Sequence, residues 1–280
     1  MTTITSLSGG MSSAMIEDKF PADFLVFALV RSDNKKTLFP DSKIRQIVSD
    51  RIGTEFIGTM EDDTIIYTML DLEQYFGKYI KWVTDITYEE CCHKKGGRLP
   101  SLHRRYCTTT LKINPIFNWW HSNFEEPVIM NIGYRIGEGR RVKKQLDSLN
   151  ENGLSEFKTI IGKHPSGRNK WKNIEWRKPL FPLFENFIDK MDVINNWKGK
   201  PVRFAKYNNC VGCFHRSATL LKEMSEAHPN KYDAFCDLET IGKGRFKKDY
   251  YYKDIPNMNF TLNLFASQEA EGCNSGFCGF

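Results

Sequence analysis

The chain has 280 residues, of which 40% are hydrophobic, 13% aromatic and 26% charged. This composition is typical of a folded globular protein and excludes a disordered or fibrous chain. No apolar run approaches the roughly 18 residues of a membrane-spanning helix, and the N-terminus lacks the pattern of a signal peptide, so we expect a cytosolic protein without a membrane partner. Forty Lys and Arg against 34 Asp and Glu leave a net charge of +6, which suits an anionic ligand such as a nucleotide or a nucleic acid.

The first part of the chain alternates strands with helices. Apolar runs and turn residues predict a strand at 3–7, a helix at 11–20, a strand at 23–30, helices at 40–52 and 64–76, and a strand at 80–84. The run DFLVFALV is typical of a strand that is buried on both faces. This order predicts an α/β fold, with an open, mostly parallel sheet and helices on both faces.

The rest of the chain continues this pattern and then becomes mostly helical. We expect a helix at 108–120 despite Pro115, a strand at 127–132, short strands at 157–161 and 174–176, and helices at 185–197, 217–228 and 230–241. A polar tail ending in GCNSGFCGF follows. We therefore predict a nucleotide-binding α/β domain over residues 1–177 and a helical, cysteine-containing region with a flexible tail over 178–280.

A glycine turn separates the first strand from the first helix. It reads Ser8, Gly9, Gly10, Met11, Ser12, Ser13. Glycines let the backbone turn and approach a ligand, while the amides at a helix N-terminus carry partial positive charge and bind anions. The turn matches neither the Walker pattern nor GxGxxG, so we predict a phosphate-binding loop of another kind.

This loop resembles the SGGxDS motif of the PP-loop ATP pyrophosphatase superfamily. Within it, the resemblance is to the phosphoadenosine phosphosulfate (PAPS) reductases, in which a small hydroxyl residue often replaces the Asp, as Ser12 does here. Three further segments match that family in order. They are Arg105-Tyr106-Cys107-Thr108 with Leu111-Lys112 and Pro115, then GYRIGEGRR from Gly133 to Arg141, then Lys178-Pro179-Leu180 with Phe181-Pro182-Leu183.

The resemblance implies a set of basic phosphate or sulfate ligands. Because Gly133 ends a strand, Arg135, Arg140 and Arg141 are expected at the carboxyl edge of the sheet, where open α/β folds bind ligands. A guanidinium group donates two parallel hydrogen bonds to phosphate or sulfate. Arg105 and Lys112 are candidates for the same role. The alternative is a solvated basic face, and Arg105 could equally pair with a local carboxylate.

The cysteines suggest a metal site. Cys210 and Cys213 form a CxxC motif whose glycine permits a tight turn, and Cys107 is the first candidate for a third ligand. The resembling adenylyl-sulfate reductases hold a 4Fe-4S cluster with cysteines from these segments, although their tandem Cys-Cys is replaced here by Cys107-Thr108. We expect Cys278 as the fourth ligand, with Cys273 as its rival. Zinc would satisfy the same thiolates.

Cys278 is also a candidate catalytic nucleophile. In PAPS reductases a cysteine near the C-terminus, in a Glu-Cys-Gly-aliphatic-His sequence, attacks the sulfur of the bound nucleotide. The sequence Phe277-Cys278-Gly279-Phe280 is a partial match that lacks both Glu and His. One residue cannot be both a ligand of a closed cluster and a free nucleophile.

Three functions are therefore open. The first is a PAPS reductase-like enzyme that binds adenylyl sulfate or PAPS, transfers sulfur through a thiol and is served by a thioredoxin-like reductant. The second is an ATP pyrophosphatase that adenylates an acceptor for sulfur transfer, as in tRNA thiolases and DNA phosphorothioation enzymes. The third is a non-catalytic, metal-stapled protein whose basic and aromatic stretches at 170–172 and 245–252 bind nucleic acid.

Overall fold

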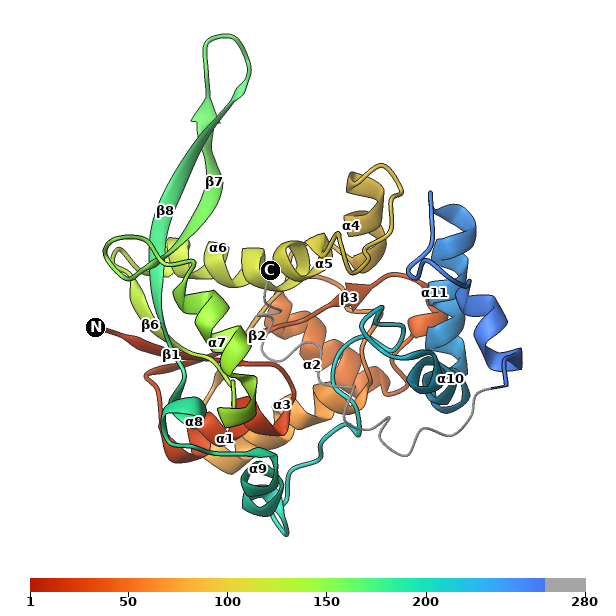
Figure 1. The fold of residues 1–280 in the computed structure, drawn as a ribbon, viewed down its shortest axis with the longest axis horizontal. Helices are drawn as coiled ribbons and strands as arrows, with labels where there is room; N and C mark the ends of the chain where they lie inside the picture. Colours follow the sequence, from red (N-terminus) through yellow and green to blue (C-terminus); the bar gives the residue numbers. More distant parts are fainter. Residues whose placement is uncertain (260–280) are drawn as a thin grey trace.

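The computed structural model describes residues 1–259, and its centre is a six-stranded sheet (Figure 1). The strands lie in the order β5-β2-β1-β6-β8-β7, and every neighbouring pair is parallel except β7 and β8. Their bounds are Thr3–Leu7 for β1, Phe24–Ala28 for β2, Ile80–Val83 for β5, Val128–Asn131 for β6, Ser155–Lys163 for β7 and Asn169–Leu180 for β8. The predicted open, mostly parallel α/β sheet is confirmed.

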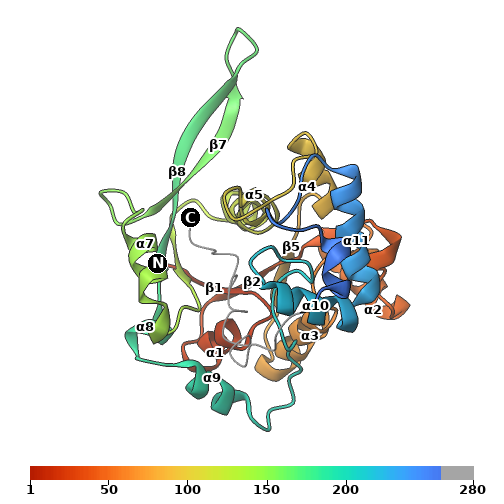
Figure 2. The ribbon, with the colours of Figure 1, turned by 45° about the vertical axis from the view of Figure 1, so that its right-hand side comes forward.

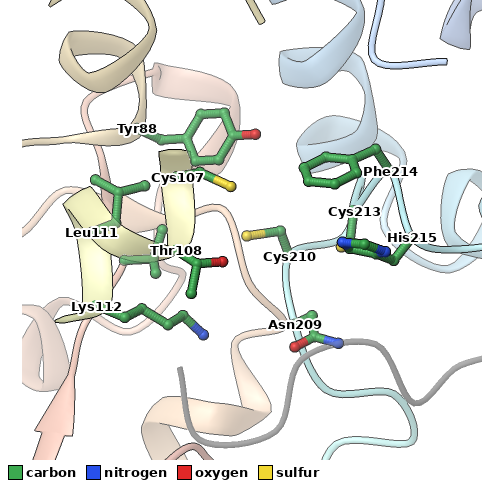
Figure 3. Close-up of a pocket in the computed structure, with 11 residues that line it drawn as sticks. Tyr88, Cys107, Thr108, Leu111, Lys112, Asn209, Cys210, Cys213, Phe214 and His215 are labelled. Atoms are coloured by element: carbon green, nitrogen blue, oxygen red, sulfur yellow. The ribbon is translucent and has the colours of Figure 1, made fainter. Parts of the chain in front are cut away.

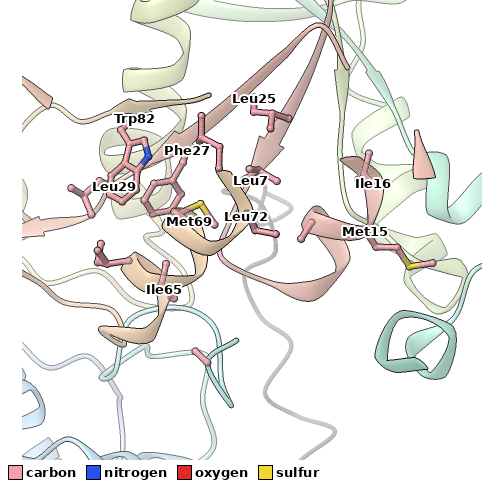
Figure 4. Packing of buried hydrophobic residues seen from close by; sticks show 14 of the residues in the cluster. Leu7, Met15, Ile16, Leu25, Phe27, Leu29, Ile65, Met69, Leu72 and Trp82 are labelled. Atoms are coloured by element: carbon pink, nitrogen blue, oxygen red, sulfur yellow. The ribbon is translucent and has the colours of Figure 1, made fainter. Parts of the chain in front are cut away.

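Helices cover both faces of this sheet, as the buried strands require. Leu25 and Phe27 of β2 pack on one side with α1 (Met11–Lys19), α2 (Ser42–Ile52) and α3 (Thr64–Phe76) (Figure 4). Val26 and Ala28, which point to the other side, pack with α6 (Asn114–Asn123) and α7 (Gly139–Leu146). Successive residues of a strand alternate between faces, so the fully apolar run of β2 contributes to both layers of the core.

Two helices differ in their bounds from the prediction. The second helix begins at Ser42 rather than Pro40, because the Asp41 carboxylate accepts hydrogen bonds from the amides of Lys43 and Ile44 and caps it. The predicted helix through Pro115 is confirmed and is longer. It runs from α5 (Tyr106–Thr108) through a π-helical turn (Thr109–Ile113) into α6, and Pro115 lies directly after the π-helical turn, at the second residue of α6.

The C-terminal helices build a third core cluster beside the sheet. It joins α10 (Ala218–Ala227), α11 (Pro229–Ile241) and the short 3-10 helix Tyr252–Asn257 to α4 (Tyr88–Lys94). The helix expected at 185–197 is instead two helices, α8 (Pro182–Glu185) and α9 (Lys190–Trp197), because Asp189 forms a capping box with Asp192 and starts a new helix. The remaining short elements are β3 (Arg31–Ser32), which pairs with β4 (Gly58–Thr59), and the 3-10 helices Lys35–Thr37 and Ile136–Glu138.

The short strands expected at 157–161 and 174–176 are parts of one long hairpin. β7 and β8 pair antiparallel along their length, and the hairpin projects from the sheet (Figures 1 and 2). The inner end of β8 pairs with β6 at Val128–Asn131, so the domain boundary expected at residue 177 falls within a strand of the main sheet. None of the described helices is long and apolar enough to span a membrane.

An ion pair joins the start of α3 to the C-terminal helices. The Asp62 carboxylate lies 3.4 Å from Nε2 of His228 and accepts a 2.8 Å hydrogen bond from the Thr64 amide. Burial alone would raise the pKa of Asp62, but the hydrogen bonds from His228 and Thr64 lower it to about 2. The ionised carboxylate therefore stabilises the folded state above its unfolded pKa of 3.8, and this contribution is lost as the pH falls toward 2.

We expect Asp62→Asn to lower the free energy of unfolding by about 1–2 kcal/mol at pH 7 and by much less near pH 2.5. Urea unfolding of both proteins at the two pH values measures the difference. A cost that is the same at both pH values would show that the charge of Asp62 contributes nothing.

Candidate functional site

The site is built where the strand order of the sheet reverses. The chain passes from β1 outward to β2 and β5 on one side, and then returns to β6 on the other side of β1. In open α/β sheets the loops diverge at this point and leave a crevice at the carboxyl ends of the strands. Here the two loops touch, because a Cβ added to Gly133, after β6, would lie 3.1 Å from the amide nitrogen of Ser13.

The loop after β1 is the predicted phosphate loop. Gly9 has φ +78°, and an added Cβ there would lie 2.6 Å from Cγ2 of Ile65, so conformation and space both require glycine. The Ser13 hydroxyl donates to the Gly10 carbonyl (3.0 Å) and accepts from the Ser8 amide (3.1 Å), which closes the turn. Gly10 is the N-cap of α1 and has no side chain to accept hydrogen bonds from the first-turn amides, at an end of the helix where amides bind anions.

The serine side chains of this loop are buried. Ser8 and Ser12 are each 7% exposed, and Ser13 is 1% exposed. The Ser13 hydroxyl forms hydrogen bonds within the turn, to the Ser8 hydroxyl and the Gly10 carbonyl.

The CxxC loop, Cys210–Cys213, is fixed to the segment that follows β4. The Val211 amide donates to the Met60 carbonyl (2.9 Å), and Glu61 forms an antiparallel bridge with Cys210. The Arg216 guanidinium donates from Nε to the Cys210 carbonyl at 3.3 Å. These bonds hold the loop from both sides, so its thiols have defined positions.

Gly212 lets this loop pack closely on the C-terminal helices. A Cβ added at Gly212 would lie 2.4 Å from the ring of Phe235 on α11. The Tyr252 hydroxyl donates to the Gly212 carbonyl at 3.1 Å. The glycine of the CxxC motif is therefore required by the close approach of an aromatic ring, whereas its φ is not positive.

The residues before the CxxC motif connect it to the phosphate loop. A Cβ added to Gly10 would lie 2.4 Å from Nδ2 of Asn208. Asn209 has φ +77°, a left-handed conformation that asparagine tolerates better than most residues. The buried side-chain oxygens of Asn208 and Asn209 have no hydrogen-bond partner among the described residues. These buried oxygens lie between the predicted phosphate loop and the CxxC loop, where they can accept hydrogen bonds from a ligand.

The three described cysteines of the predicted metal site line one pocket. Cys107 and Cys210 point toward one another, and Cys213 lies on the Cys210 side (Figure 3). The apolar walls of this pocket are formed by Val30, Tyr88, Leu111 and Phe214. Burial raises the pKa of the Cys107 thiol to about 12 and that of Cys210 well above its usual range. Such thiols are poor nucleophiles by themselves, but a metal ion would deprotonate them on binding.

A single metal ion has no ready-made site in this pocket. Within residues 1–259, no three His, Cys, Asp or Glu side chains are placed to hold one ion. A zinc ion needs donors at about 2.0–2.3 Å in a tetrahedron. In the described part of the chain, Cys107, Cys210 and Cys213 line the pocket without forming a preformed site for one ion.

The Lys112 ammonium, a predicted phosphate ligand, is bonded to a carboxylate. It lies 2.8 Å from Oε1 of Glu61, and both side chains are buried. Burial opposes the charge of Lys112, but Glu61 more than compensates and raises the pKa of the ammonium. Removal of either partner of such a pair leaves a buried charge. The role of Lys112 in the structure is therefore to hold Glu61 and the attached CxxC loop in place, rather than to face a phosphate.

Positive charge gathers at the edge of the thiol pocket. Burial, together with the positive charges of Arg105, Lys247 and Arg141, lowers the pKa of His215 to about 4. His215 is therefore neutral at pH 7, and its buried Nε2 has no protein partner in the described part of the chain. The Arg141 guanidinium lies over the Tyr134 ring at 4.3 Å. Of the predicted basic residues, Arg105 interacts electrostatically with Cys107 and Cys213, whereas Arg141 is ion-paired with Glu138.

The other two predicted arginines occupy different positions. Arg135 is buried and its Nε donates to Oε2 of Glu138 at 3.2 Å, so this guanidinium organises the turn after β6. Arg140 is exposed on α7. Cys273 and Cys278 lie outside the described residues.

Sequence reasoning missed several members of this site. Asn208 and Asn209 precede the CxxC motif directly, and two adjacent asparagines beside a glycine-containing turn were a usable signal. Glu61 had no such signal, because its partner Lys112 lies 51 positions later in the chain. His215 lies two positions after the CxxC motif, and the structure places it in the wall of the pocket.

Comparison with known proteins adds no relative. No family model, curated protein or solved structure matches this chain.

Proposed function

We propose that this chain is an enzyme of PAPS reductase type, which binds an adenine nucleotide at the β1–α1 loop and carries out thiol-dependent sulfur chemistry. One observation carries the proposal. The glycine loop and the cysteine pocket, distant in sequence, adjoin through Asn208 and Asn209 at the crevice of a parallel sheet. Nucleotide phosphates and sulfur ligands could therefore occupy one continuous site.

The residues divide into an anion-binding part and a sulfur part. The first-turn amides of α1 are proposed to hold phosphate, and Arg105 and Arg141 to balance charge beyond it. Cys107, Cys210 and Cys213 are proposed to hold a 4Fe-4S cluster, whose fourth ligand would be Cys278 or Cys273. Such a cluster supplies electron transfer or a Lewis-acidic iron when bound.

In the reductase reaction a cysteine outside the cluster attacks adenylyl sulfate. The thiolate forms a bond to the sulfonate sulfur, the bond from that sulfur to the phosphate oxygen breaks, and AMP leaves with the electron pair. A thioredoxin-like dithiol then reduces the thiosulfonate and releases sulfite. In this scheme Cys278 is the nucleophile and Cys273 is the cluster ligand.

One observation favours the alternative, in which ATP is the substrate. Burial raises the pKa of the Cys107 and Cys210 thiols, so neither of them is a ready thiolate nucleophile. In the alternative, an acceptor oxygen attacks the α-phosphorus of ATP, pyrophosphate leaves, and a sulfur nucleophile then displaces AMP. That chemistry needs the same loop and no free cysteine.

Two labelled substrates separate these functions. The full chain, purified without oxygen, is incubated with labelled adenylyl sulfate plus a dithiol, and separately with labelled ATP plus nucleic acid acceptors. Sulfite release supports the reductase, and acceptor-dependent pyrophosphate release supports the alternative. Nucleotide binding without turnover would leave a binding protein, and no binding of either nucleotide would overturn the proposal.

A further inference from the structure

The outer part of the β7–β8 hairpin is an arm without a role in the nucleotide site. We define the distal arm as residues 157–173, which carry the ends of β7 and β8 and the turn between them. At its base, Phe157 stacks on Phe117 of α6 with ring centroids 4.3 Å apart. Beyond this contact the two strands pair with each other and project away from the sheet (Figures 1 and 2).

The distal arm concentrates positive charge. It contains five Lys and Arg residues and no Asp or Glu, and all five are exposed: Lys158, Lys163, Arg168, Lys170 and Lys172. The nearest carboxylates, Glu156 and Glu175, lie at its base and accept hydrogen bonds from asparagine amides. Five unbalanced charges in one projection, in a chain whose net charge is +6, form a strong local attraction for a polyanion.

Apolar side chains are exposed between these charges. Trp171 is 53% exposed and pairs in register with Ile160, which is 47% exposed. The Lys158 ammonium lies 5.8 Å from the centre of the Trp171 ring. An indole flanked by lysines is suited to contacts with sugars and bases beside phosphates.

The arrangement of the charges selects the kind of polyanion. Residues alternate across a ribbon, so Lys158, Ile160 and Trp171 share one face, and Thr159, Lys170 and Lys172 share the other. A membrane surface favours cations on one face and apolar groups on the other. Cations on both faces fit a groove with phosphates along both walls.

We propose that the distal arm binds duplex DNA by lying in the major groove. That groove is about 12 Å wide and admits a two-stranded β-ribbon, whereas the major groove of duplex RNA is too narrow. The six residues 158–163 extend about 20 Å, enough to follow the groove past several phosphates. This proposal does not depend on the nucleotide site, and a DNA acceptor would link the two.

Fluorescence anisotropy with a labelled random-sequence DNA duplex tests the proposal. We expect the triple variant Lys158→Gln, Lys170→Gln, Lys172→Gln to bind at least about tenfold more weakly and to reduce the slope of log affinity against log salt by about 2.7. Trp171→Ala removes an apolar side chain that can contact base edges in the groove, so it should also weaken binding. All the changed side chains are exposed, so thermal unfolding should remain unchanged.

A second triple variant controls for net charge. Lys19→Gln, Lys43→Gln, Lys198→Gln removes the same charge from exposed positions at the end of α1, on α2 and after α9. It should bind DNA nearly as well as the unaltered protein. Equal weakening by both triple variants would overturn the proposal, as would tighter binding to single strands, duplex RNA or anionic phosphatidylserine vesicles. Nucleotide binding by the arm variant should be unchanged, so failure here and failure of the nucleotide site are distinguishable.

Discussion

We expect Cys210→Ser to remove the iron of the proposed cluster from the anaerobically purified protein. Cys210 points into the pocket toward Cys107, and its loop is fixed by backbone bonds to Met60 and Glu61, so the serine variant should keep the pocket and lose a thiolate. The unaltered protein should show the broad visible absorbance of an iron-sulfur cluster with matching iron and sulfide. Cys107→Ser and Cys213→Ser should behave as Cys210→Ser does.

Cys236→Ser provides the matched control for these variants. Cys236 is also half-buried, but it lies on α11 beside Asp233 and Glu239, away from the pocket. Its replacement should leave iron content and absorbance unchanged. If the unaltered protein contains zinc, or if all four serine variants retain full iron, then the three-cysteine pocket is not a cluster site.

Gly10→Ala is the second substitution for which we expect a large effect, in this case on nucleotide affinity. An added Cβ would lie 2.4 Å from Nδ2 of Asn208, at the contact between the phosphate loop and the CxxC loop. The backbone there has φ −100°, so alanine causes no conformational strain, and the Asn208 side chain can move. We therefore expect the free energy of unfolding to change by about 1 kcal/mol or less. The added methyl group lies where phosphate is proposed to approach the amides of α1, so affinity for ATP or adenylyl sulfate should fall about 10- to 100-fold, which corresponds to the loss of one or two buried hydrogen bonds.

Isothermal titration with each nucleotide measures this effect. Gly137→Ala is the control, because nothing lies within 4 Å of a Cβ at that exposed position, and φ there is not positive. It should bind nucleotide as the unaltered protein does. Unchanged affinity in Gly10→Ala would place the nucleotide elsewhere.

The sequence predicted those parts of the fold that depend on local patterns. The apolar run of β2 and the glycine turn after β1 each carry their signal within a few residues, and the sheet and the loop follow from them. The hairpin was predicted as two short strands because residues 158–172 have few buried side chains. Its strands are held by pairing with each other, which a single-segment pattern does not reveal.

The candidate site was less predictable because its contacts are long-range. Cys107 and the CxxC motif were grouped from the family resemblance, and the structure brings them to one pocket. The same resemblance, together with their charge, assigned Lys112 and Arg135 to phosphate, but the structure pairs them with Glu61 and Glu138. An arginine or lysine pattern does not reveal which carboxylate lies opposite.

The short segment from Met60 to Ile65 is in contact with both halves of the site. Ile65 lies under Gly9 of the phosphate loop, while Met60 and Glu61 bond to the CxxC loop. The two loops thus rest on one piece of backbone only six residues long. A shift of Gly9 toward Ile65 would therefore be transmitted through this short segment to Cys210. The positions of the thiols thus depend on the conformation of the phosphate loop.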